Sequence, residues 1–228
     1  MDEPSDTNAR RARGRPRAEP KLGDAPTEEQ ILKAAGEVFA EFGFGGASTR
    51  EIARRAGLRQ PSLYHYFPNK AAMLTALIEQ AGEGSLAIFR KIDSLQAPAA
   101  VKLYRAAYLE SRMLAGWPDY LKVICQLPEL RQPRHVHFIE IRDRIIAWYQ
   151  KTIADGVAAG EFRTVDPLFV GWLINGANEA IFDQAPITPR LDPDSHARAV
   201  AGFVLNAVLG DPRQFDSIVV AADLSGAD

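Results

Sequence analysis

Residues 48–70 of this 228-residue chain concentrate side chains that can bind phosphate oxygens and the edges of nucleic-acid bases. The segment carries a net charge of +4, because one acidic residue, Glu51, is outnumbered by Arg50, Arg54, Arg55, Arg59 and Lys70. Its second half adds the polar and aromatic side chains Gln60, Ser62, Tyr64, His65 and Tyr66. Arginine binds phosphates and guanine edges, and short polar donors contact both phosphates and bases. We therefore expect a nucleic-acid contact here, with an ordinary solvated basic face as the alternative.

Two short helices are predicted to carry these side chains. Ser48 and Glu51 form a capping-box pattern that opens the first helix. Gly57 comes where that helix ends and the backbone turns, and Pro61 fits the first turn of the next helix. Two short helices joined by a glycine turn are typical of a helix-turn-helix, whose second helix enters the DNA major groove.

The second predicted helix has one buried face and one exposed face. Leu63 and Phe67 are four residues apart and are expected to point into the core. Tyr64, His65 and Tyr66 then lie mainly off the buried face. Three such side chains in succession are costly on an ordinary surface, so the pattern favours DNA binding over a purely structural helical hairpin.

A longer motif in this segment indicates a family. The run Leu63-Tyr64-His65-Tyr66-Phe67-Pro68-Asn69-Lys70, preceded by Ile52-Ala53 and Ala56-Gly57-Leu58, resembles the DNA-binding head of the TetR family of one-component transcriptional regulators. The resemblance covers about residues 27–74. It implies a helical head that reads DNA, followed by helices that pair with a second copy and hold a small-molecule effector.

The same resemblance assigns roles to individual residues of the head. Three residues are expected to approach base edges: Arg50, Gln60 and Pro61. Four are expected to bind phosphates: Thr49, Tyr64, Tyr66 and Lys70. His65 is expected to make a contact of either kind.

One position departs from the family pattern. Many members carry Ser or Thr immediately before the recognition helix, where the hydroxyl acts as an N-cap. This chain has Arg59 there, and an arginine cannot cap a helix in that way. Arg59 can instead contact a guanine through two hydrogen bonds or bind a phosphate.

A second basic cluster precedes the first predicted helix. Residues 10–21 carry six basic residues against Glu19, a net charge of +5, within a segment that lacks apolar periodicity. The run Arg13-Gly14-Arg15-Pro16-Arg17 contains the Gly-Arg-Pro core of an AT-hook, an arginine-flanked segment that enters narrow A·T minor grooves. Arg13, Arg15 and Arg17 are expected to enter the minor groove, and a basic arm that follows the DNA backbone non-specifically is the alternative.

The charge of the whole chain hides these clusters. With 27 basic and 29 acidic residues the net charge is −2, which alone argues against a nucleic-acid binder. Residues 1–70, however, hold 12 basic and 10 acidic residues (+2), and residues 71–228 hold 15 and 19 (−4). Locally clustered positive charge is what phosphate binding requires.

Composition excludes several other classes of protein. A hydrophobic content of 46% and a charged content of 25% are ordinary for a globular chain. No apolar stretch approaches the roughly 18 residues that span a membrane, and the polar N-terminus does not resemble a signal peptide. The single cysteine, Cys125, excludes an internal disulfide framework. We expect a cytoplasmic protein.

Helical patterns run almost to the end of the chain, so the predicted fold class is all-α: a three-helix DNA-binding head with a helix-turn-helix, and a larger helical domain for effector binding and dimerisation. The first helix is expected to open at Thr27 and to stop at Gly43–Gly46. Later helices are expected over 69–92, 98–115, 118–127, 134–159, 166–184 and 193–210. The expected divisions are a disordered basic arm (1–26), the helix-turn-helix domain (27–70), the helical ligand-binding and dimerisation domain (71–210) and a loosely ordered C-terminal tail (211–228), in which residues 218–220 can dock.

The resemblance implies that the last two long helices, near 166–184 and 193–210, form a homodimer interface. Their apolar stripes and the glycines at positions 171, 176 and 202 suit close helix packing. An intramolecular core is the alternative explanation of the same stripes.

An effector pocket is expected among the middle helices, where aromatic and polar side chains mix. The candidate effector-binding residues are Tyr108, Arg112, Trp117, Tyr120, His137 and Trp148, each of which can equally be a core or surface residue. His135 and His137 point to different faces of a helix, so no metal site is expected. Cys125 fits a buried small hydrophobe better than a redox sensor. No cofactor is expected.

The predicted function is a transcriptional repressor that binds a palindromic DNA operator as a homodimer and is released by a small-molecule effector. A DNA-binding activator or architectural protein without effector release is the alternative. An enzyme is disfavoured, because the sequence contains no recognisable catalytic constellation or nucleotide-binding loop.

Overall fold

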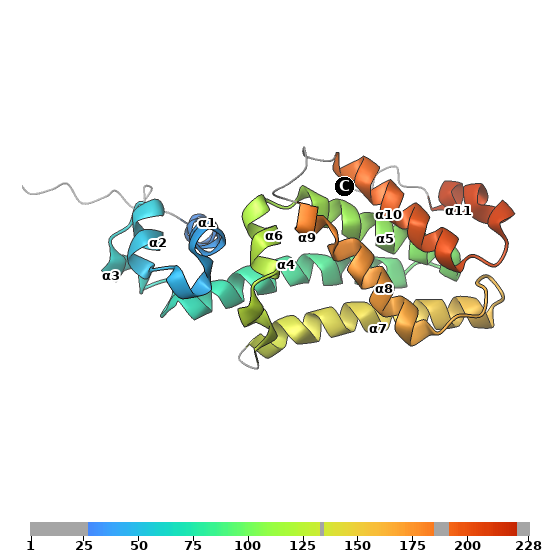
Figure 1. Ribbon diagram of the computed structural model, residues 1–228, viewed down its shortest axis with the longest axis horizontal. Coiled ribbons are helices and arrows are strands. Elements are labelled where there is room, and N and C mark those ends of the chain that lie inside the picture. The colour runs from blue at the N-terminus through green and yellow to red at the C-terminus, as the bar shows by residue number, and fades with distance from the viewer. Residues whose placement is uncertain (1–26, 133–134, 185–191, 223–228) are drawn as a thin grey trace, which may run out of the picture.

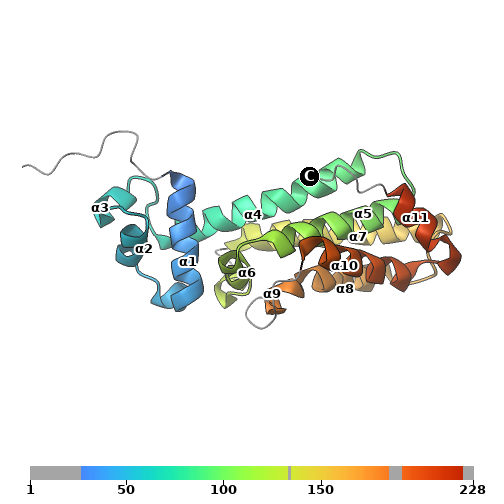
Figure 2. The ribbon, with the colours of Figure 1, turned by 90° about the horizontal axis from the view of Figure 1, so that it is seen from above.

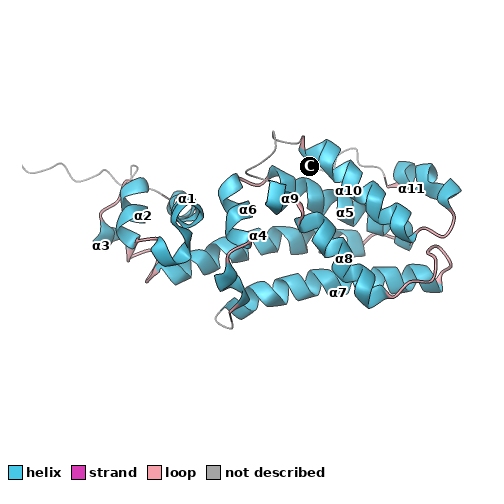
Figure 3. Cartoon of the chain, viewed as in Figure 1, coloured by secondary structure: helices cyan, strands magenta, loops and turns pink. Residues whose placement is uncertain are grey.

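The computed structural model describes residues 27–132, 135–184 and 192–222. In these ranges the regular secondary structure is helical, and the β-type pairing consists of an isolated bridge between Phe162 and Leu209 (Figure 3). The predicted all-α fold is confirmed. No helix in the described ranges is long and apolar enough to cross a membrane.

The head of the molecule consists of α1 (Glu28–Gly46), α2 (Thr49–Arg55) and α3 (Gln60–Leu63). Thr27 caps α1 as predicted, because its hydroxyl accepts from the Gln30 amide while the Gln30 side chain accepts from the Thr27 amide. Gly43 interrupts α1 with a φ of 67°, and one further turn follows to Gly46. The head core is apolar and closely packed; its fully buried side chains include Ile31, Val38, Phe39, Ile52 and Leu63.

Helix α4 (Lys70–Asp93) connects the head to the rest of the molecule. Its first half places Met73 and Leu74 in the head core, and its second half places Phe89 and Ile92 in the core of the body. In Figures 1 and 2 it runs from the head along the length of the body. One continuous helix therefore belongs to both parts.

The body is a bundle of α5 (Ala99–Gly116), α6 (Asp119–Cys125), α7 (Val136–Ala158), α8 (Pro167–Glu179), α9 (Ile181–Gln184) and α10 (Pro193–Val208), with a 3-10 turn η1 (Pro128–Arg131) after α6. Helix α5 lies inside the bundle and packs against α4, α7, α8 and α10. Fully buried side chains such as Leu103, Tyr149 and Ile153 form its core.

Apart from shifts of a few residues at helix ends, the observed helices differ from the predicted ones at three places. The second helix of the helix-turn-helix, predicted to carry both Leu63 and Phe67, ends as α3 at Leu63 and is followed by a turn over residues 64–66, although both side chains are buried as predicted. The helix expected over 166–184 is divided at Ala180 into α8 and α9, and the division lets Ile181 and Phe182 pack against Leu114. The segment expected as a loosely ordered tail contains a turn, η3 (Pro212–Gln214), and a helix, α11 (Phe215–Ala221), with Ile218 buried against the body.

Candidate DNA-binding surface and effector cavity

Local packing fixes the angle between α2 and α3. The Ser48 hydroxyl caps α2 by accepting from the Glu51 amide at 3.2 Å. At the end of α2, Gly57 adopts a φ of 72°, and the Leu58 amide donates to the Ala53 carbonyl at 2.8 Å. A positive φ favours glycine, so the turn between the two helices is specified by its sequence. The arrangement is the predicted helix-turn-helix.

Three of the predicted DNA-binding side chains form a hydrogen-bonded triad, Thr49–Gln60–Tyr64, across α2 and α3. The Gln60 Nε2 atom donates to the Thr49 Oγ1 atom at 2.9 Å and lies 3.4 Å from the Tyr64 hydroxyl. The Thr49 and Tyr64 hydroxyls are 3.1 Å apart. Hydrogen bonds from Thr49 and Gln60 lower the pKa of Tyr64, whose side chain is exposed. The triad holds these polar atoms in place at the surface.

The basic residues of the segment divide into paired and unpaired groups. Arg54 and Arg55 both bind Glu51, with N–O distances of 2.6 and 2.9 Å, and Arg55 also binds Glu41. These contacts lower the pKa of Glu51 to about 2. Arg50 and Arg59 are exposed and make no ion pair within the described ranges. They are therefore the arginines best placed for DNA.

Arg50 and Arg59 line one groove of about 490 Å³ between α2 and α3, together with Gln60. Beyond this groove, α3 and the turn after it expose Pro61, His65 and Tyr66, and leave Ser62 half-buried. The structure thus brings nine of the ten predicted DNA-binding residues to one region of the head. Arg13, Arg15 and Arg17 lie outside the described residues.

Lys70, the tenth residue, is engaged inside the head. Its Nζ atom donates to the carbonyls of Phe44, Gly45 and Ala47 at 2.6, 3.1 and 3.0 Å. The carbonyls that end a helix lack partners within it, and a lysine ammonium has three donors to offer them. The ammonium also lies 4.7 Å from the centre of the Phe44 ring. Lys70 would have to break these contacts to bind a phosphate as expected.

The body contains a small inner cavity of about 60 Å³ among α4 to α9. Most of its wall is apolar or aromatic, with residues from α4, α6, α7 and α9 such as Ile78, Cys125, Phe138, Ile141 and Phe182. Trp117, at the end of α5, also lines it and stacks on Phe182 at 6.0 Å. Of the six predicted effector-binding residues, Trp117 is the one that reaches this cavity.

Polar groups in the wall of the inner cavity were missed at the sequence level. Glu110 from α5 is 3% exposed and accepts from the Tyr149 hydroxyl and the Asn178 amide at 2.7 and 2.6 Å. Burial and the nearby Glu179 raise the pKa of Glu110 to about 7. Glu179 and Asn175 from α8 also line the cavity. A charged or amide residue inside an apolar helical stripe was the signal that could have revealed them.

The other effector candidates have different surroundings. Tyr108 is buried and donates to Asp194, and Arg112 lies 3.8 Å from the same carboxylate. Trp148 donates to Asp93 at 2.9 Å. His137 is exposed and lies 3.5 Å from Glu140. Arg112 borders a separate surface groove between α5 and the start of α10.

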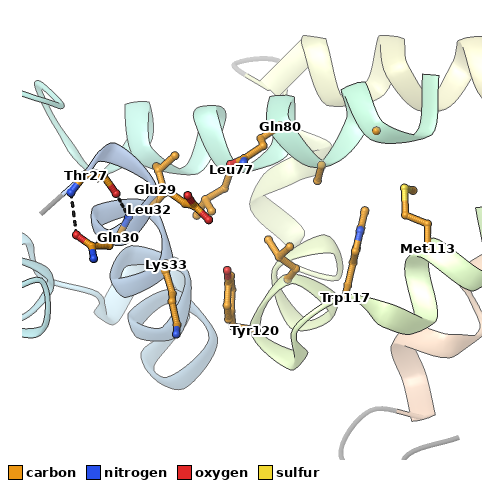
Figure 4. A pocket seen from close by; sticks show the side chains of 13 residues that line it. Thr27, Glu29, Gln30, Leu32, Lys33, Leu77, Gln80, Met113, Trp117 and Tyr120 are labelled. Atoms are coloured by element: carbon orange, nitrogen blue, oxygen red, sulfur yellow. Dashed lines mark hydrogen bonds between the residues drawn. The ribbon is translucent and has the colours of Figure 1, made fainter. Parts of the chain in front are cut away.

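Tyr120 lies at a larger cleft between head and body. This junction cleft, of about 610 Å³, is lined by residues of α1, α4, α5 and α6. Figure 4 shows Lys33 and Gln30 of α1 on one side, Met113 on the other, and Trp117 and Tyr120 between them. Trp117 therefore borders both the junction cleft and the inner cavity.

Two further observations concern the earlier expectations for metal and thiol chemistry. No group of three or more histidine, cysteine or acidic side chains within metal-binding reach occurs among the described residues. Burial raises the pKa of the Cys125 thiol to about 12, so it stays protonated and behaves as an apolar wall residue.

Helices α8 and α10 expose an apolar surface away from the cavity. Its large side chains are 49–69% exposed and comprise Leu168, Phe169, Trp172, Leu173 and Phe203. A cluster of this kind on an otherwise well-packed protein marks an interaction surface. The predicted dimer helices thus present the exposed face that dimerisation needs, and they also contribute Ile174, Ala201 and Leu205 to the internal core.

Comparison with known proteins agrees with the geometry of the head. The family model described as "Bacterial regulatory proteins, tetR family" matches residues 31–77. The HTH-type transcriptional regulator RutR of Escherichia coli K12 is 28% identical over 163 residues, which span 70% of this chain and 75% of RutR.

Solved structures share the fold of nearly the whole chain. The crystal structure of Mycobacterium smegmatis AmtR matches with a TM-score of 0.70 and 28% identity, and covers 91% of this chain and 97% of AmtR. AibR, solved in complex with isovaleryl coenzyme A and operator DNA, matches with a TM-score of 0.67 and 18% identity over 77% of this chain and 96% of AibR. The helix-turn-helix, the helical body and these similarities agree: the chain carries the DNA-binding domain of the TetR family of transcriptional regulators on a body that shares the fold of such regulators, which makes it a regulator and not an enzyme.

Proposed function

We propose that this regulator is a repressor that binds a palindromic operator as a homodimer and is released when a small molecule enters its body. The carrying observation is the Thr49–Gln60–Tyr64 triad, in which Tyr64 is exposed, with Arg50 and Arg59 beside it. Helix α4 joins this surface to the inner cavity. The protein is proposed to act in the cytoplasm, where it meets its DNA.

For the DNA contacts, we assign base edges to Arg50, Gln60 and Pro61, and a guanine or a phosphate to Arg59. Bidentate arginine contacts to guanine are the commonest specific contact in the major groove. Phosphate contacts are assigned to Thr49, Ser62, Tyr64 and Tyr66, and a contact of either kind to His65. The arm with Arg13, Arg15 and Arg17 is assigned to the minor groove.

For the assembly, we propose that the exposed faces of α8 and α10 pair with the same faces of a second copy. Burying side chains such as Trp172 and Phe203 supplies the driving force. Two heads held in this way can read two half-sites about one DNA turn apart, which is why the operator is expected to be palindromic. Residues 27–70 are proposed as the DNA-binding unit and 71–210 as the effector and dimerisation unit.

For release, we propose that the effector favours a body conformation that binds DNA poorly. Ile78 and Phe138 belong to the head's hydrophobic cluster and also line the inner cavity. A ligand that moves them changes the packing on which the head rests, and its preference for one conformation sets how strongly DNA affinity falls. The complex of AibR with isovaleryl coenzyme A and operator DNA supports an effector in proteins of this fold.

The test uses DNA fragments selected from a random-sequence pool by the wild-type protein. Arg50→Ala and Arg59→Ala should each weaken retardation of these fragments by about tenfold or more, because a good bidentate contact contributes about 1–3 kcal/mol of discrimination. Arg90→Ala, which removes an exposed arginine of α4 paired with Glu83, is the control and should leave binding unchanged. If all three variants bind alike, the assignment of the reading surface is wrong.

The second candidate function, an activator or architectural protein without effector release, is favoured by one observation. The inner cavity of about 60 Å³ is far smaller than typical ligand pockets, which hold about 300–1,000 Å³. Retardation assays with candidate effectors distinguish the two functions. Release of DNA by a ligand that binds the body supports the repressor, whereas ligand-independent retardation supports the alternative.

A further inference from the structure

We propose that the inner cavity binds a small hydrophobic monocation, such as a protonated primary amine with a short alkyl chain. The inference rests on the proposed effector site and names the chemical class of its ligand. It follows from three features of the cavity wall: its apolar lining, its two carboxylates and the position of Arg142, the one basic side chain among its described residues.

The apolar lining favours a ligand whose non-polar part is small and compact. Ile78, Ile141 and Ile145 supply aliphatic surface, and Phe182 supplies an aromatic ring that Trp117 extends by stacking. The volume of about 60 Å³ admits a short chain without rearrangement of the helices. A ring system such as Trp117 also attracts a cation over its face.

The carboxylate of Glu110 gives the cavity its charge preference. Its hydrogen-bond partners, Tyr149 and Asn178, are both neutral, and the side chain is 3% exposed. An ionised carboxylate buried among neutral groups is costly unless a cation pairs with it. The raised pKa of Glu110 reflects this cost. A ligand ammonium can provide the missing counter-charge.

A second carboxylate reinforces this preference. Glu179 lines the same cavity, raises the pKa of Glu110 and has a raised pKa itself, mainly through burial. Two carboxyl groups in one cavity repel an anionic ligand. A neutral ligand of the same size would leave Glu110 without a charged partner.

Arg142, the one basic residue among the described residues of the wall, acts on Glu179 and not on Glu110. The guanidinium of Arg142 lies 5.4 Å from the centre of the Trp172 ring and 3.3 Å from Asp143, whose side chain is 56% exposed. Arg142 and Arg131 lower the pKa of Glu179, so their charge acts on that carboxylate. Glu110 therefore remains available to pair with a cationic group of the ligand. A long anionic ligand such as a coenzyme A thioester would need more basic side chains than this cavity offers.

The experiment measures ligand binding to the full-length protein by calorimetry in the absence of DNA. The probes are primary alkylamines from ethylamine to hexylamine, with the alcohol and the carboxylate of each chain length. At least one amine should bind about 10- to 100-fold more tightly than its alcohol and its carboxylate, as expected for a charge-assisted contact. Glu110→Gln should remove this preference and leave the affinity for the alcohol unchanged.

Two controls keep the result interpretable. Glu140→Gln makes the same charge change on α7 outside the cavity and should leave amine binding intact. Glu179→Gln, a second cavity variant, should weaken amine binding, and thermal unfolding of each variant shows whether it is folded. The proposal is overturned if no amine binds up to millimolar concentration, if an alcohol or carboxylate binds as well as its amine, or if Glu140→Gln weakens binding as much as Glu110→Gln. Amine binding without DNA release would instead contradict the repressor function alone.

Discussion

The ammonium group of Lys70 shows how one side chain can hold a DNA-reading surface in shape. It joins the first turn of α4 to the carbonyls of Phe44 and Gly45 in the last turn of α1 and to the carbonyl of Ala47, which precedes α2. Without it, these carbonyls would lose a charged partner in a partly buried place. The placement of α2, and with it Thr49, therefore depends on a residue that lies outside the recognition helix.

Replacing Lys70 distinguishes this role from the phosphate contact expected from the sequence. Lys70→Met should lower the free energy of unfolding by about 1–3 kcal/mol, because several carbonyls lose their donor. Urea denaturation measures the change, and Lys91→Met on the exposed side of α4 is the control. The phosphate role would be supported instead if Lys70→Met were as stable as the wild type and its DNA binding depended less on salt, by about one phosphate contact.

Glu110 gives the protein a measurable pH dependence. Its pKa is raised from an ordinary value of 4.5 to about 7, so between these pH values the folded protein holds a proton that the unfolded chain has lost. Protonated Glu110 therefore stabilises the folded protein at low pH. This contribution to the free energy of unfolding, about 3 kcal/mol in all, is lost as the pH rises from about 4.5 to about 7.

Glu110→Gln tests this, because glutamine keeps a hydrogen-bonding side chain without a titration. The stability difference between variant and wild type should grow in favour of the variant over that pH range and then level off. Denaturation at several pH values measures it. A constant difference would show that Glu110 titrates normally.

Single residues also show where the sequence was sufficient and where it was not. The location of Thr49, Gln60 and Tyr64 on the helix-turn-helix could be predicted, because it follows from short-range helical spacing and a specific motif. The bonds of Lys70 could not, since its partners are backbone carbonyls more than 20 residues earlier in the chain. Glu110 and Glu179 come from different helices, and the sequence does not show that one cavity unites them.

At the scale of the elements, the contact between α1 and α6 couples the head to the body. A Cβ atom on Gly36 would lie 2.5 Å from the Tyr120 ring, so the two helices approach closely only because this position is glycine. The aromatic ring cannot yield as a flexible chain end would. Any motion of α6 is therefore transmitted to α1 by direct contact.

Gly36→Ala should lower the stability of the protein by about 1–3 kcal/mol through overpacking, although alanine in a helix normally gains up to about 1 kcal/mol over glycine. Gly116→Ala at the end of α5 is the matched control, because nothing lies within 4 Å of its Cβ position. Thermal or urea unfolding of both variants gives the comparison. Equal stabilisation by both substitutions would mean that Tyr120 adapts and that the coupling is loose.

The helices themselves were largely predictable, because capping residues and prolines mark their starts. Thr27, Pro167 and Pro193 were predicted to mark helix starts, and they lie at the starts of α1, α8 and α10. The division at Ala180 was not predictable, since it depends on Ile181 and Phe182 reaching Leu114 in α5. The docking of α11 likewise depends on contacts with distant α5, such as the Tyr104–Phe215 ring pair.

At the scale of the whole molecule, the exposed apolar surface of α8 and α10 predicts the assembly state. Leu173→Glu or Phe203→Glu places a charge among side chains that are proposed to be buried in a dimer, where an unpaired charge is costly. Either variant should be monomeric at micromolar concentration in light-scattering measurements and should retard operator fragments at least about tenfold more weakly.

Val220→Glu is the control for this experiment, because Val220 is 78% exposed on α11 and lies off the proposed interface. It should remain dimeric and bind DNA normally. A dimer that survives both interface substitutions would show that the copies pair through another surface.

Ile78 and Phe138 have a consequence for how such a regulator can diversify. Because both side chains line the cavity and pack in the head's hydrophobic cluster, a substitution there that accommodates a new ligand also alters the fold of the DNA reader. Ile145, Asn175 and Phe182 border the cavity without belonging to that cluster. Ligand preference should therefore evolve, or be engineered, more readily through the α7–α9 wall, where a substitution leaves the head's own packing untouched.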